Sequence, residues 1–167
     1  MKVNKIILGA LISISALSCR KSEVPVGVTA PEITAAKSNQ LPVLTAWNGL
    51  SNWNARQTGQ ETVNSGIITD AAISADVLSN GIVLVYAKQQ NQVNQLPFRS
   101  GQLSLSYSVM PGAISIVVEG NGSTIQGILL SYIILSGEQL ASLEAKQFSR
   151  AGLLNLSYDE VAAIIVQ

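Results

Sequence analysis

The strictest pattern in this chain is an alternation of apolar and polar residues over residues 102–110. The apolar positions are Leu103, Leu105, Tyr107 and Val109, and serines stand between them. A period of two predicts a strand that buries one face. The Pro111-Gly112 pair then predicts a turn, and residues 113–119 predict a returning strand. The region is therefore typical of a β-hairpin.

Other apolar segments of strand length lie on both sides of this hairpin. Residues 82–87 are apolar throughout, which predicts a strand buried on both faces. Residues 125–135 predict a long strand in which Gly127 forms a bulge. Residues 43–47 predict an edge strand that ends in a turn at Asn48-Gly49.

Two stretches are too polar to predict a buried strand. Residues 53–66 suit at most a loosely formed hairpin, and residues 89–95 predict a loop in which only Val93 is apolar. Leu96-Pro97-Phe98 then returns the chain to the core.

Helix signals are short and lie mainly at the C-terminus. Ser74 is a candidate N-cap for one helical turn over residues 75–79, which a C-terminal stop at Asn80-Gly81 ends. Ser136-x-x-Gln139 and Ser157-x-x-Glu160 are capping-box patterns. In the helix after Ser136, the predicted inner face consists of Leu140 and Leu143 with Gln147. In the helix after Ser157 it consists of Val161, Ile164 and Ile165, which we expect to pack back on the sheet.

Strands recur at a spacing of roughly ten residues, and helices come only at the end. The sequence therefore predicts a mainly β fold. We expect an antiparallel β-sandwich, or a partly open barrel, with short C-terminal helices. This domain is assigned to residues 43–167.

The N-terminus has the layout of a secretory signal over residues 1–18. Lys2 and Lys5 precede an apolar stretch over residues 6–17, which is too short to span a membrane as a helix. The following Ala16-Leu17-Ser18-Cys19 resembles the lipobox of bacterial lipoproteins, in which the cysteine is lipidated. An ordinary cleaved signal with a chance cysteine is the alternative. Lipidation would also explain why Cys19 is the sole cysteine of a secreted chain.

Residues 19–42 are predicted to be a flexible tether. They contain scattered prolines and small residues with no sustained period. The alternation of Val24, Val26 and Val28 leaves a first strand open as the alternative.

Composition excludes several kinds of chemistry. The chain has no histidine, and lipidation would consume its one cysteine, so catalytic triads, cysteine nucleophiles and histidine-rich metal sites are excluded. Ten basic residues balance ten acidic ones without a basic run, so we expect no nucleic-acid partner. We expect no enzyme activity, no cofactor and no metal.

One stretch points to ligand binding. Trp47 and Trp53 lie among amide side chains, with Asn54 and Arg56 close by, and aromatic faces beside amides suit a sugar. The alternative is that both indoles anchor the core, because they are the largest apolar groups in a chain with few aromatic residues.

Residues 73–86, Leu96-Pro97-Phe98 and the ending over residues 156–161 together resemble segments of small Bacteroidota-type lipoproteins. The resemblance covers about half of the chain after Cys19 and implies a compact β-sandwich without assigned catalytic residues. Residues 131–133 depart from it by lacking an arginine in the late strand. The expected function is a Gram-negative outer-membrane lipoprotein, facing the periplasm or the cell surface. It would act as a non-enzymatic interaction or structural module with a protein or glycan partner. A carbohydrate-binding module using Trp47 and Trp53 is the alternative.

Overall fold

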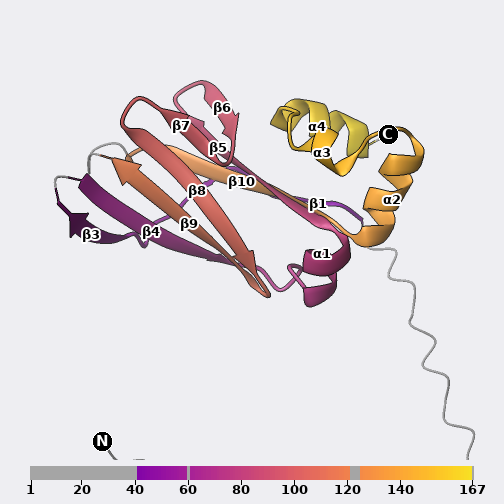
Figure 1. The fold of residues 1–167 in the computed structure, drawn as a ribbon, viewed down its shortest axis with the longest axis horizontal. Helices are drawn as coiled ribbons and strands as arrows, with labels where there is room; N and C mark the ends of the chain where they lie inside the picture. Colours follow the sequence, from indigo (N-terminus) through magenta and orange to yellow (C-terminus); the bar gives the residue numbers. More distant parts are fainter. Residues whose placement is uncertain (1–40, 60, 121–124, 167) are drawn as a thin grey trace, which may run out of the picture. The chain divides into compact units, whose positions relative to one another are not determined.

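Two antiparallel sheets and four short helices form the part of the chain that the computed structural model describes, residues 41–59, 61–120 and 125–166 (Figure 1). In sheet A the order is β1-β10-β5-β6, and β2 also pairs with β10. Its strands are β1 (Val43–Leu44), β2 (Asn48–Gly49), β5 (Ile82–Gln89), β6 (Gln92–Gln95) and β10 (Ile128–Leu135). In sheet B the order is β3-β4-β9-β8-β7. Its strands are β3 (Asn54–Thr58), β4 (Glu61–Thr69), β7 (Phe98–Ser100), β8 (Leu103–Met110) and β9 (Ala113–Gly120).

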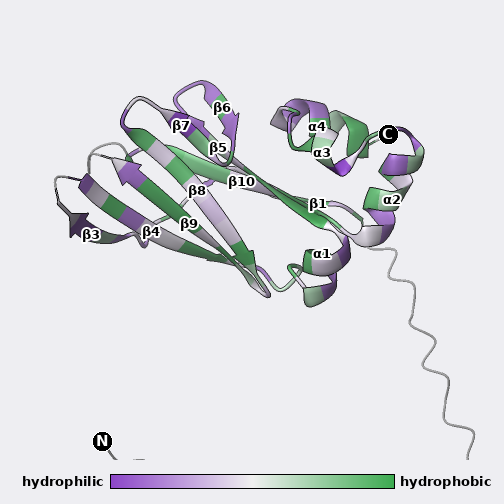
Figure 2. Ribbon diagram, in the orientation of Figure 1, coloured by the Kyte–Doolittle hydropathy of each residue, from purple (hydrophilic) through white to green (hydrophobic). Residues whose placement is uncertain are grey.

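The main core lies between the two sheets. Sheet A contributes alternate residues of β5 and β10, and sheet B contributes alternate residues of β8 and β9. Examples are Val85 and Leu130 from the first sheet and Leu105 and Ile116 from the second, all at most 3% exposed. Figure 2 shows the matching alternation of hydrophobic and paler bands along β8 and β9. The predicted mainly β fold with two packed sheets is confirmed.

The opposite face of sheet A is buried by the C-terminal helices. These are α2 (Gly137–Ala145), α3 (Arg150–Leu153) and α4 (Tyr158–Ile165), which Figure 1 shows gathered beside β10. Leu84 and Ile133 pack there against helix residues such as Leu153 and Val161, and all four are fully buried. The prediction that residues 82–87 are buried on both faces is therefore confirmed, as is the packing of α4 on the sheet.

The helix ends form as the sequence predicts. Ser74 caps α1 (Ala75–Asn80) by accepting a hydrogen bond from the Val77 backbone N–H. Both capping boxes are present, at Ser136 with Gln139 and at Ser157 with Glu160. The short helix α3, which Ser149 caps, was not predicted. Gln147 does not extend the apolar face of α2, because it lies past the helix at a positive φ of 72° and is exposed.

The predicted edge strand over residues 43–47 forms only in part, at Val43–Leu44, and the predicted turn at Asn48-Gly49 is wrong. Val43–Leu44 and Asn48–Gly49 are two short strands that pair in succession with β10. Four residue steps separate Leu44 from Asn48, but their partners Ile133 and Leu130 are three steps apart. The extra residue is a β-bulge in the edge strand. Ser131, fully buried in β10, stabilises it by donating a hydrogen bond of 2.8 Å to the Thr45 carbonyl.

Two further boundaries differ from the prediction. The polar stretch over residues 89–95 is not a loop, because β6 pairs with the end of β5 across a turn in which Gln90 has a φ of 55°. Strand β10 begins at Ile128, and Gly127 precedes it at a φ of 74° instead of forming a bulge within it. The weak hairpin signal over residues 53–66 does correspond to a hairpin, β3 with β4.

Candidate functional site

The structure places Trp47 on the helix-covered face of sheet A. Its ring lies 5.0 Å from that of Tyr158 in α4, and the Lys88 amine lies 5.9 Å from the Trp47 ring centroid. Tyr158 in turn meets Tyr86 edge-on at 5.4 Å. Trp47 is half-buried and belongs to the cluster beneath the helices.

The other three predicted binding residues lie on different faces. Trp53 packs against the core between the sheets, where Gly66 leaves room for its ring. Asn54 and Arg56 are exposed on β3 and pair with Ser65 and Val63 on the outer face of sheet B. The structure therefore does not bring Trp47, Trp53, Asn54 and Arg56 into one site.

A different set of amides and one aromatic ring does meet, at the end of the sandwich beside the β5–β6 hairpin. On β5 the inward-facing row runs Val83, Val85, Ala87 and then Gln89. On β6 the cross-strand partners of Gln89 and Ala87 are Gln92 and Asn94, so these two amides share the inward face. The apolar interior thus becomes polar at this end.

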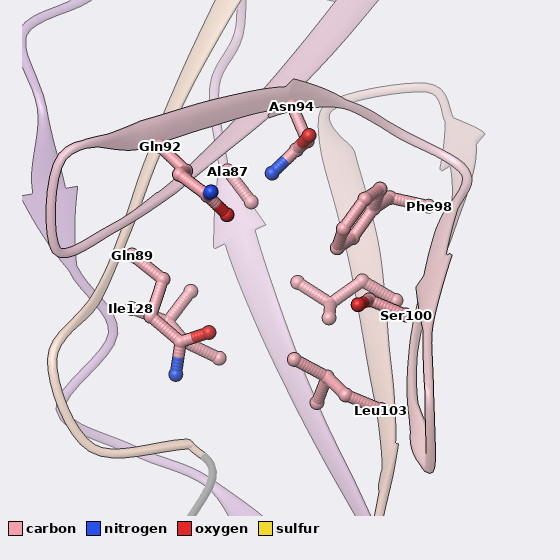
Figure 3. A pocket seen from close by; sticks show the side chains of 9 residues that line it. Ala87, Gln89, Gln92, Asn94, Phe98, Ser100, Leu103 and Ile128 are labelled. Atoms are coloured by element: carbon pink, nitrogen blue, oxygen red, sulfur yellow. The ribbon is translucent and has the colours of Figure 1, made fainter.

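These side chains line a pocket of about 110 Å³ between the two sheets (Figure 3). Sheet A contributes Ala87, Gln89, Gln92, Asn94 and Ile128, and sheet B contributes Phe98, Ser100, Leu103 and Leu105. Figure 3 shows the amides of Gln92 and Asn94 and the ring of Phe98 directed toward the same space. Because residues 89–95 were predicted to be a loop, sequence reasoning missed this pocket. The one signal was the run of amides itself.

A further amide lies in the same end of the interior. Asn64 is 2% exposed, and its Nδ2 has no hydrogen-bond partner within the described residues. It stands in one cross-strand row with Val118, Leu105 and Phe98. Polar character at this end therefore extends beyond the pocket wall itself.

Within the described ranges, two further cavities border the C-terminal helices. The larger, about 440 Å³, is an open and mostly apolar groove. It is lined by Gln147, Phe148, Ser149, Gly152, Leu156, Glu160, Ala163 and Ile164. The other, about 130 Å³, lies between Pro42, Leu135 and residues of α2 and α4.

Glu160, which lines the larger groove, is also part of a helix cap. Ser157 donates a hydrogen bond of 2.7 Å to the Glu160 carboxylate, which lowers the pKa of that carboxylate. Glu160 is thus accounted for as a helix cap.

Burial perturbs the pKa of three tyrosines in the described part of the chain. Desolvation raises the pKa of Tyr86, Tyr107 and Tyr132 above the ordinary value. For Tyr132 the hydrogen bond that its hydroxyl donates to Asp70, at 2.7 Å, raises the pKa further. The neutral phenol is the form that the fold stabilises.

We expect the domain to lose stability as the pH rises above about 10. Unfolded tyrosines release their protons at that pH while the folded ones retain them, so the unfolded state binds fewer protons and unfolding becomes easier. Urea denaturation at about pH 8 and about pH 11 measures the loss. Tyr132→Phe should be about 1 kcal/mol less stable near pH 8 through loss of the Asp70 bond, but should lose less on going to alkaline pH. An identical alkaline loss in the variant would contradict this.

Cys19 and the predicted signal and tether up to residue 40 lie outside the described residues. Within the described ranges no helix is long and apolar enough to cross a membrane. In the same part of the chain, no three His, Cys, Asp or Glu side chains gather as a metal site would need. Comparisons with protein-family models, with curated proteins and with solved structures find no match for this chain.

Proposed function

We propose that this chain is a lipid-anchored, non-enzymatic interaction module of a Gram-negative outer membrane, facing the periplasm or the cell surface. The observation that carries the proposal is Cys19, which follows a charged and apolar leader and is the sole cysteine. The absence of histidine from the whole sequence supports binding over catalysis. Leu41, the first described residue, is 84% exposed, which suits a tether that leaves the domain at its surface.

Cys19→Ala should abolish incorporation of a labelled fatty acid and move the protein from the membrane to the soluble fraction. The reason is that only the cysteine thiol can accept the lipid, and the described domain offers no other thiol. Metabolic labelling in a Gram-negative host, followed by fractionation, measures both effects. Ser18→Ala is the matched control, because it keeps a small residue before an unchanged cysteine. Equal label in Cys19→Ala and wild type would end the proposal.

Carbohydrate binding is the second candidate function. Trp47 and Trp53 support it less than their spacing in the sequence suggested, because they pack in two separate clusters. The observation that favours it is the amide-lined pocket at the β5–β6 end of the sandwich.

A further inference from the structure

The pocket beside the β5–β6 hairpin has two chemically different walls. The sheet A wall carries Gln89, Gln92 and Asn94 at inward-facing positions, where a sandwich otherwise places apolar residues. The sheet B wall carries Phe98, Leu103 and Leu105. A ligand that fits must therefore present an apolar face to one side and hydrogen-bonding groups to the other.

None of the nine lining residues carries a charge. Lys88 and Arg99 are next to pocket residues in the sequence, but their side chains point away from the pocket. Lys88 lies on the opposite face of sheet A over Trp47, and Arg99 is exposed on the outer face of sheet B opposite Ser104. A phosphate or carboxylate ligand would be desolvated here without a counter-charge, which is costly. The lining therefore favours a neutral ligand.

Amide side chains both donate and accept hydrogen bonds, and so do hydroxyl groups. A sugar ring combines a rim of hydroxyls with an apolar C–H face that an aromatic ring can cover. We infer that this pocket binds the terminal ring of a neutral saccharide, with Gln92 and Asn94 on its hydroxyls and Phe98 against its apolar face. This inference rests on the second candidate function, carbohydrate binding, and deepens it by naming the class of saccharide and the residues that hold it.

The volume sets how much of the ligand can enter. Pockets that enclose a whole drug-sized ligand measure roughly 300–1,000 Å³. The observed volume of about 110 Å³ suits the part of one terminal ring that lies between Phe98 and the amides, with the remaining sugar units in solvent. Gln92 and Ser100 are exposed, so they stand where such a chain would leave the pocket.

The test uses the full-length protein in detergent micelles on an array of neutral oligosaccharides and their uronic-acid or sialylated counterparts. Calorimetry then compares the best neutral ligand with the methyl glycoside of its terminal ring. We expect binding of neutral termini only, and the methyl glycoside should bind within about tenfold of the oligosaccharide because one ring makes most contacts. Preference for acidic glycans, or no binding of any neutral saccharide, would overturn the inference. Neither result bears on lipid uptake at Cys19, so the proposed function is judged separately.

Variants locate the site. Asn94→Ala and Phe98→Leu should each weaken binding about tenfold, which corresponds to about 1.4 kcal/mol. Ser100→Trp places a large ring at the exposed mouth of the pocket and should abolish binding. Gln102→Ala removes an exposed amide that does not line the pocket and should leave the affinity unchanged. Thermal unfolding confirms that each variant is folded. Full binding by folded Asn94→Ala and Ser100→Trp would refute the assignment, as would loss of binding in Trp47→Ala alone.

Discussion

Replacement of Gly81 by alanine is expected to lower the free energy of unfolding by about 3 kcal/mol. A Cβ at this position would lie 2.1 Å from the Leu135 carbonyl oxygen and 3.0 Å from that of Val77. Both are backbone atoms, so neither can turn aside as a side chain would. The φ of −98° is open to any residue, so the obstacle is space alone. Gly81 lets the end of α1 and the start of β5 lie directly against the end of β10.

Gly49→Ala is the matched control for this substitution. A Cβ on Gly49 would meet Leu129 at 3.8 Å and the Ile128 carbonyl at 3.9 Å, which is ordinary contact. We expect a change of no more than about 0.5 kcal/mol. Urea denaturation of the two variants measures the contrast. A loss for Gly81→Ala as small as that for Gly49→Ala would contradict the close approach of the Leu135 carbonyl to Gly81.

The second large effect is expected at Ile133. Ile133→Ala should destabilise the domain by about 3 kcal/mol, because it removes a fully buried side chain from between β10 and the C-terminal helices. A loss this size is a large share of the stability of a typical domain.

Ile67→Ala provides the comparison on the other sheet. Ile67 lies on the outer face of sheet B and is 62% exposed, so its loss should cost about 0.5 kcal/mol. Both substitutions remove the same atoms from a strand, so the contrast between them reports chiefly how far each side chain is buried. Equal destabilisation by the two would mean that the helices do not cover sheet A in solution.

Several elements were predictable because their signals are local. The alternation over residues 103–110 depends on the pleat of one strand, and Ser157 with Glu160 forms its cap within a single helical turn. Residues 82–87 indicated burial on two faces, although nothing local could tell which elements would cover them. The prediction of a loop over residues 89–95 was wrong because this strand has almost no local signal. Strand β6 has only Val93 as an apolar signal, and its pairing with β5 produces the strand.

The sequence by itself determined the hairpin of β8 with β9, the burial of residues 82–87 on both faces, the caps of α1, α2 and α4, the absence of histidine and the single cysteine. Only the tertiary structure decided which face each side chain occupies. Plain alternation from Val43 would put Trp47 in the core between the sheets, but the bulge opposite β10 turns it toward α4. That bulge depends on Ser131, which lies 86 residues from Thr45 in the chain. The pocket has the same origin, since it exists only where β6 and β7, on two different sheets, bring Asn94 and Phe98 together. Register between distant strands is a property of pairing, and no single stretch of residues contains it.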